Sequence, residues 1–171
     1  MIRSEKKLKE LSAILRGENT LLINEAIKSL RKEEPFEGAI GLLVEYYNDV
    51  ADMTGLKIIE DFLNDMKDRS VRTEIVAEIR NPWKANTISM LISSCWQSGL
   101  DYSEYMRDVV KIYLEGDYST AVECMTVIEE SARMSSREQK DEIIRIVEDS
   151  PLSYADEKKA LTQELILILE V

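Results

Sequence analysis

The chain contains no histidine, and its 171 residues include only two cysteines, six glycines and three prolines. Without histidine it lacks the usual general base, the Ser-His and Cys-His nucleophile pairs and the commonest metal ligand. It also lacks the GxxxxGK(S/T) and GxGxxG patterns of glycine-rich phosphate-binding loops. The two cysteines alone do not make a zinc site. We therefore expect no metal and no cofactor.

Long apolar runs are also missing. No stretch approaches the ~18 consecutive apolar residues of a membrane-spanning helix, and the N-terminal sequence MIRSEKKLKELSAIL has no apolar core of the signal-peptide type. We therefore predict a cytoplasmic protein without a membrane partner. Cys95 and Cys124 fall on apolar faces of predicted helices, where buried reduced thiols are expected. A disulfide between them would require Cα atoms within about 7 Å of each other.

Positive charge is scarce outside the N-terminus. The chain has a net charge of −11, yet its first sixteen residues carry five cations against two carboxylates, a local charge of +3 that leaves −14 for the remainder. Nucleic acids and anionic membranes need a basic face, so we expect neither as a partner. Acidic surfaces mostly serve solubility, although a basic protein partner is electrostatically plausible.

The residues that are present favour helices. An apolar content of 44% with 32% charged residues fits a folded protein and not a disordered one. Apolar residues recur at helical spacing and helix-breaking residues are few, which predicts about ten helices. The length of the chain suits one domain, residues 1–171. The expected helices cover residues 4–15, 19–30, 35–47, 52–66, 70–80, 82–98, 101–116, 117–131, 136–147 and 153–171.

Local signals set several of these boundaries. Pro35 and Pro82 suit the first position of a helix, with Asn81 as a cap. Asp101 to Glu104 and Ser136 to Gln139 are candidate capping boxes. No alternating segment is long enough to predict a sheet. The run LILIL at 165–169 is compatible with a strand, but the length of the segment and the preceding pattern favour a helix that is apolar nearly all round.

The sequences of three predicted helices, at 52–66, 82–98 and 117–131, can be aligned with one another. Their caps Asp52, Asn81 and Asp117 coincide at offsets of 29 and 36 residues. Three apolar positions then coincide as well: Ile59, Ile88 and Cys124; Phe62, Leu91 and Val127; Leu63, Ile92 and Ile128. Such irregular antiparallel pairs resemble the HEAT and armadillo class of helical repeats. The resemblance implies a right-handed α-solenoid of about five antiparallel hairpins.

One segment resembles a different repeat family. Residues 112–131 read IYLEGDYSTAVECMTVIEES, in which five residues match the glycine, aromatic and alanine positions of a tetratricopeptide repeat: Tyr113, Gly116, Asp117, Tyr118 and Ala121. These positions require a tight turn at glycine and a small residue where two helices approach. The 34-residue period does not continue elsewhere, so we prefer the HEAT-like array. A helical bundle without repeats remains an alternative.

Paired carboxylates are the only candidate chemistry. Runs such as Glu60-Asp61 and Glu129-Glu130 have the composition of acid-base pairs or of a site for a hard cation. Charge runs on helices are usually solvated faces. A carboxylate-based enzyme would need these acids to converge in a concave pocket with raised pKa values.

One cluster of aromatic and polar side chains is a candidate partner-binding patch. Trp and Tyr are enriched at protein interfaces, and the cluster flanks a turn between two predicted helices. Packing of the aromatic rings in the core is the competing interpretation. The cluster comprises Trp83, Trp96, Gln97, Asp101, Tyr102 and Tyr105.

The sequence as a whole favours a non-catalytic protein-binding or scaffold module, because solenoids present long binding surfaces. A tetratricopeptide-like peptide-binding module and a carboxylate-based enzyme are the alternatives. The protein partner is not named by the sequence. A homo-oligomer assembled through the apolar helix at the C-terminus is a further hypothesis.

Overall fold

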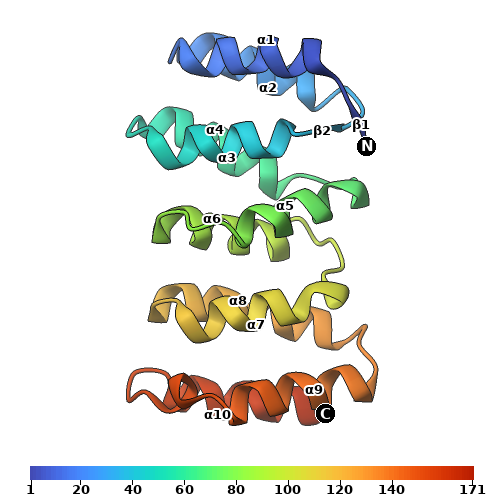
Figure 1. The fold of residues 1–171 in the computed structure, drawn as a ribbon, viewed down its shortest axis with the longest axis vertical. Coiled ribbons are helices and arrows are strands. Elements are labelled where there is room, and N and C mark those ends of the chain that lie inside the picture. Colours follow the sequence, from blue (N-terminus) through green and yellow to red (C-terminus); the bar gives the residue numbers. More distant parts are fainter. The chain divides into compact units, whose positions relative to one another are not determined.

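The computed structural model describes residues 1–171, and it is all-helical apart from one pair of two-residue strands. Ten α-helices follow one another with short connections (Figure 1). The helices are α1 (Glu5–Arg16), α2 (Thr20–Leu30), α3 (Ala39–Asp49), α4 (Met53–Asn64), α5 (Arg72–Ile79), α6 (Ala85–Gln97), α7 (Met106–Glu115), α8 (Tyr118–Ala132), α9 (Arg137–Glu148) and α10 (Lys159–Glu170). The prediction of an all-α protein with about ten helices is therefore confirmed.

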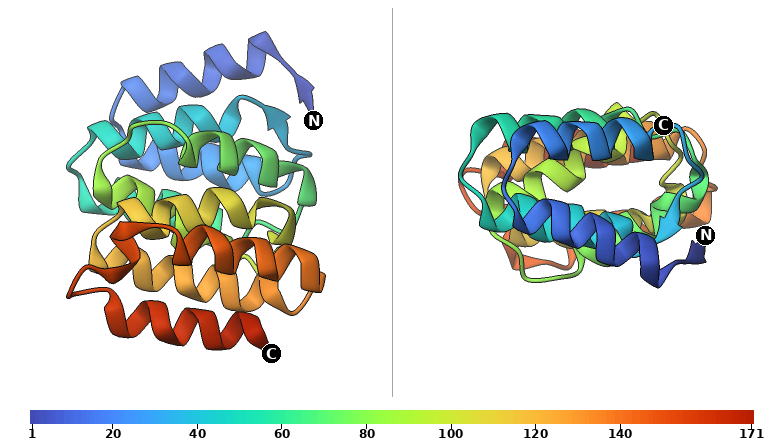
Figure 2. Two further views of the ribbon diagram at one scale, coloured as in Figure 1. Left: turned by 60° about the horizontal axis from the view of Figure 1, so that its bottom comes forward. Right: turned by 90° about the horizontal axis from the view of Figure 1, so that it is seen from above.

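The chain divides into two compact units, Met1–Ser98 and Gly99–Val171. The first unit holds α1 to α6. Within it, α1 packs on α2 and α3 on α4, while each helix also packs on the next but one: α1 on α3, α2 on α4, α3 on α5 and α4 on α6. Figure 2 shows α1 and α2 side by side when the unit is viewed from above. The prediction of a single repeat domain over residues 1–171 stays a prediction.

The second unit follows the same packing rule. Here α7 packs on α8 and α9 on α10, while α7 contacts α9 and α8 contacts α10. Two 3₁₀ turns, Ser103–Tyr105 and Pro151–Tyr154, precede α7 and α10. The LILIL run is helical, as predicted: Leu165 and Leu169 are buried, while Leu167 is 62% exposed.

The predicted apolar stripes form the cores of these units. Of the nine residues overlaid on α4, α6 and α8, eight are buried and Ile88 is half-buried. The burial follows from helical periodicity, because residues three and four apart share one face of a helix. Both cysteines are buried thiols, as expected.

Four helix starts were predicted correctly at their caps. Asn19, Asp52 and Asp117 each accept hydrogen bonds from backbone N–H groups of the helix that follows. Ser136 and Gln139 form the predicted capping box at the start of α9. These side chains satisfy donors that the first turn of a helix leaves without an intrahelical partner.

Two proline-based predictions were wrong. Pro35 does not begin a helix: Phe36–Glu37 forms the strand β2, which pairs in parallel with β1 (Ile2–Arg3), and α3 begins at Ala39. Pro82 does not begin α6, which starts at Ala85, so Asn81 is not its cap. In both places a side chain from another helix bonds to the helix start: Glu74 accepts from Gly38 N and Ile40 N, and Asn48 accepts from Lys84 N and the Thr87 hydroxyl.

Two further starts were predicted too early. The segment from Asp101 leads into a 3₁₀ turn, with Asp101 Oδ1 accepting a hydrogen bond from Ser103 N, and α7 begins only at Met106. Likewise a 3₁₀ turn at Pro151–Tyr154 comes before α10, which begins at Lys159. A 3₁₀ turn is a common way to enter a helix, and it shifts the first α-helical residue along the chain.

Candidate functional site

The aromatic cluster predicted from the sequence is divided between the two units. In the first unit, Trp83 is half-buried and its Nε1 donates a hydrogen bond to Glu78 Oε2 at 3.2 Å. Trp96 is 38% exposed, and the Gln97 side chain donates to Ser93 Oγ. Trp96 and Gln97 therefore lie at the surface of this unit.

In the second unit the structure brings Tyr102 and Tyr105 together, with ring centroids 6.3 Å apart and planes tilted by 56°. Tyr102 is only 1% exposed, so its ring packs in the core of this unit. Asp101, which shapes the turn before α7, is half-buried. A partner-binding role for the six predicted residues stays a prediction.

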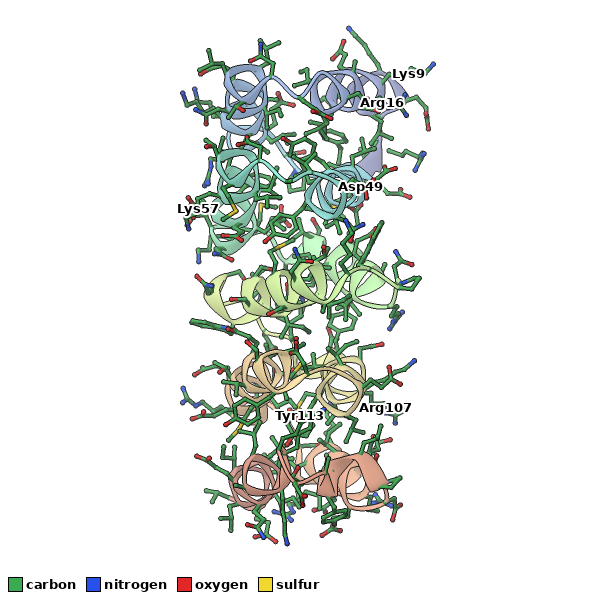
Figure 3. The ribbon with its side chains drawn as sticks, turned by 90° about the vertical axis from the view of Figure 1, so that its left-hand side faces the viewer. Lys9, Arg16, Asp49, Lys57, Arg107 and Tyr113 are labelled. Atoms are coloured by element: carbon green, nitrogen blue, oxygen red, sulfur yellow. The ribbon has the colours of Figure 1, made fainter.

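A different feature emerges in the first unit, where a groove runs between α1 and α3. Two adjoining pockets of about 240 and 530 Å³ share Ser12, Arg16 and Leu42 in their linings. We call this feature the α1–α3 groove. Figure 3 shows Lys9, Arg16 and Asp49 together on this side of the unit and Lys57 on the opposite side.

Four charged side chains of the groove make no salt bridge within the chain. Lys9 and Arg16 come from α1, whereas Glu45 and Asp49 come from α3. All four are exposed, and neither cation forms an ion pair with a carboxylate of this chain. Arg16 shares the smaller pocket with Glu18, Glu45 and Asp49, whereas Lys9 lines the larger pocket, where Arg3 and Glu5 pair with each other at 2.7 Å.

Helical spacing explains why these charged residues line the groove. Leu8, Leu11 and Leu15 form the buried stripe of α1, so Lys9, one position after Leu8, and Arg16, one position after Leu15, lie at the edge of that stripe. On α3 the buried stripe borders Leu42, Glu45 and Asp49 in the same way. Leu15 and Leu42 add apolar surface between the charges.

The N-terminus of α3 is already occupied by a carboxylate. Glu74 of α5 accepts hydrogen bonds from Gly38 N at 2.7 Å and from Ile40 N at 3.3 Å. Gly38 has φ 91°, a left-handed conformation that favours glycine. Because Glu74 satisfies these amides, anion recognition in the groove depends on the side chains of α1.

Tyr46 is the one aromatic residue that lines the groove. Its ring lines the smaller pocket and is buried. Burial raises the pKa of the Tyr46 hydroxyl, and the negative charges of Asp52 and Glu18 raise it further. The hydroxyl therefore stays neutral at physiological pH.

A third pocket, of about 450 Å³, differs in its electrostatics. It lies between the end of α2 and the end of α4. Its principal cation, Arg31, pairs with Asp65 at 2.7 Å and stacks over the Phe62 ring at 5.6 Å. Since the charge of Arg31 is satisfied within the chain, this pocket is a weaker candidate than the α1–α3 groove.

The carboxylates do not gather into a catalytic cluster. Every resolved carboxylate shift lowers the pKa, as at Asp52 and Asp117, where backbone N–H groups at helix starts stabilise the ionised form. No three His, Cys, Asp or Glu side chains are arranged to hold a metal ion. The carboxylate-enzyme alternative thus gains no supporting observation from these sites.

The sequence did not predict the groove. The composition showed that the first sixteen residues are basic. Glu45 and Asp49 of α3 were not distinguishable from the other carboxylates of the chain. Nothing in the sequence indicated that α1 and α3 are neighbours, because that depends on how hairpins stack.

Comparisons of the chain with protein-family models, with curated proteins and with solved structures found no match. None of the helices combines the length and the apolar character that crossing a membrane requires.

Proposed function

We propose that this chain is a non-catalytic binding module of the helical-repeat type, a HEAT-like α-solenoid that docks a segment of a partner protein in the α1–α3 groove. The packing of each helix on the next but one, found in both units, supports the repeat architecture. The observation that carries the binding role is the groove itself, where Arg16 and exposed carboxylates of α3 flank apolar surface without forming a salt bridge.

The chemistry of the groove suits association rather than catalysis. Its cations and carboxylates are solvent-exposed, and exposed charges contribute mainly to specificity and to the rate of encounter. A general acid or base works best with a pKa near the working pH, whereas backbone N–H groups lower the pKa of Asp52 and Asp117.

The tetratricopeptide-like alternative rests on the turn between α7 and α8. A Cβ on Gly116 would lie 2.8 Å from the Ile112 carbonyl oxygen, and Ala121 is completely buried. Gly116 fits a tight turn, and Ala121 fits a close approach of two helices. They are confined to one hairpin, so we favour the HEAT-like interpretation.

A peptide selection tests the binding role. The full chain is immobilised and presented with a display library of random 12-residue peptides. Selected peptides are then tested against Ser12→Trp, which places a large ring where the two pockets meet, and against Ser29→Trp on α2 as a matched surface control. We expect binding to be lost with the first variant and kept with the second. Absence of peptides sensitive to Ser12→Trp overturns the proposed function.

A further inference from the structure

We infer that the smaller pocket of the α1–α3 groove takes a single basic side chain, lysine or arginine, of the partner segment. This inference rests on the proposed function and names the chemistry that anchors the partner. The pocket, of about 240 Å³, is lined by three exposed carboxylates, those of Glu18, Glu45 and Asp49, and by one exposed cation, Arg16. Three negative charges and one positive charge leave a net charge of −2 in the pocket.

The chain itself does not neutralise these carboxylates. None of the three forms an ion pair within the chain, and Asp49 accepts only the neutral amide of Asn48, at 3.0 Å. The acidic side chains are not arranged to hold a metal ion, which requires several oxygen ligands within about 2.6 Å of one point. An ammonium or guanidinium group donates in several directions, so it suits carboxylates that are spread around a pocket.

A buried hydroxyl without a partner is a second, independent observation. Tyr46 lines the pocket and is only 7% exposed, yet its hydroxyl forms no hydrogen bond within the chain. Buried polar groups nearly always have a partner. The charge of Glu18, which lines the same pocket, acts on this hydroxyl. The Tyr46 oxygen is therefore placed to accept a hydrogen bond from a cationic N–H group that enters beside Glu18.

The apolar lining of the pocket suits the stem of a long basic side chain. Leu15, Leu42 and Val50 line the pocket together with Tyr46. Lysine and arginine lay their aliphatic stems along apolar surface and keep the charged head at polar groups. The combination of apolar surface and carboxylates therefore matches these two side chains better than a small inorganic cation, which has no stem.

The larger pocket directs a basic anchor to the smaller one. Arg3 and Glu5 pair with each other there, which leaves Lys9 and Arg16 as the unpaired charges of its lining. Like charges at an interface repel each other, so the larger pocket disfavours a basic side chain. The smaller pocket is therefore the position in the groove at which a cation of the partner is attracted.

The test uses the full chain and the same peptide selection. Each peptide sensitive to Ser12→Trp is synthesised again with its basic residues replaced one at a time, arginine by citrulline and lysine by norleucine. These replacements keep most of the side chain and remove its charge. We expect one of them to weaken binding at least about tenfold in calorimetric titrations, and by less at high salt, because charge contacts are screened.

Carboxylate variants locate the anchor. In Glu45→Gln with Asp49→Asn, the charged and the neutral form of the peptide should bind within about threefold of each other. The matched control is Glu115→Gln with Glu164→Gln, which removes the same charge from exposed carboxylates that do not line the pocket. This control should keep the full preference for the charged form.

Arg16→Gln supplies a readout of opposite sign. It removes the cation of the pocket itself, so we expect the charged form of the peptide to bind about threefold more tightly. Lys6→Gln changes the net charge equally at an exposed lysine outside both pockets and should leave the affinity unchanged. Tyr46→Phe, which keeps the ring and removes the hydroxyl, should weaken the charged form about threefold.

Each outcome has a defined meaning. If the double carboxylate variant fails to fold by circular dichroism, Glu45→Gln alone replaces it, with a reduced preference for the charged form expected. Three results overturn this inference and leave the proposed function standing: groove-dependent peptides that need no basic residue, carboxylate variants that keep the full preference, or weaker binding of the charged form by Arg16→Gln. Absence of groove-dependent peptides overturns both.

Discussion

The ammonium nitrogen of Lys158 lies 3.0 Å from the carbonyl oxygen of Tyr113 and donates a hydrogen bond to it. The same group donates to the carbonyl oxygens of Leu114, at 2.9 Å, and of Gly116. Lys158 is buried, and it caps the C-terminus of α7, where carbonyl groups lack intrahelical partners. Within the second unit it therefore ties the segment before α10 to the end of α7.

Replacing Lys158 by methionine should destabilise the protein substantially. The change keeps an aliphatic stem but leaves buried carbonyl oxygens without a donor, which we expect to lower the unfolding free energy by about 2–3 kcal/mol. Urea denaturation followed by circular dichroism measures the effect. The neighbouring substitution Lys159→Met affects an exposed side chain and should change stability by less than about 0.5 kcal/mol. Equal effects at the two positions would contradict the capping role.

Asn48 caps a helix to which it does not belong. Its Oδ1, on α3, accepts hydrogen bonds from Lys84 N at 3.0 Å and from the Thr87 hydroxyl at 3.1 Å at the start of α6. Asn48→Ala should cost about 1 kcal/mol, because Lys84 N and the Thr87 hydroxyl lose their acceptor. Asn86→Ala, at an exposed position within α6, should be neutral or slightly stabilising by the same denaturation assay. A neutral Asn48→Ala variant would refute the cap.

Gly55 makes room for the hydroxyl of Tyr46. A Cβ on Gly55 would lie 2.5 Å from that oxygen, so Gly55→Ala should lose about 1 kcal/mol in spite of alanine's better helix propensity. In a Tyr46→Phe background the oxygen is absent, and the same substitution should become neutral or stabilising. Gly17→Ala is the control, because its nearest neighbour is 3.4 Å away and its φ is −74°. Thermal unfolding of the four variants tests whether the effect of Gly55→Ala depends on the Tyr46 hydroxyl.

Three tyrosines should make stability fall at alkaline pH. Burial raises the pKa of Tyr46, Tyr47 and Tyr113, and at Tyr47 a hydrogen bond donated to Glu60 at 2.6 Å raises it further. Unfolded tyrosine ionises near a pH of about 10. Above this pH the unfolded chain releases protons that the folded chain retains, so the unfolding free energy falls as pH rises.

Absorbance at 295 nm and denaturation across this pH range test the expectation. Some of the seven tyrosines should titrate only with unfolding. Tyr47→Phe should make the loss of stability with pH shallower, while Tyr154→Phe, at an exposed ring, should leave the slope unchanged. Titration of every tyrosine near its ordinary pKa in the folded protein would contradict the assignment.

The sequence by itself determined the helices and their buried faces. Apolar periodicity depends only on the geometry of one helix, so the stripe of Leu8, Leu11 and Leu15 was predictable. The same holds for the caps at Asp52 and Asp117, whose side chains bond to amides two or three residues away. Short-range interactions of this kind depend only on residues that are close together in the sequence.

Tertiary structure decided what depends on contact between distant residues. The starts of α3 and α6 form hydrogen bonds with the side chains of Glu74 and Asn48, which lie 34 to 36 residues away in the sequence. These contacts override the preference of Pro35 and Pro82 for the first position of a helix. The α1–α3 groove arises in the same way. Composition revealed the cations of α1, but only the stacking of one hairpin on the next places Glu45 and Asp49 in the same pocket as Arg16.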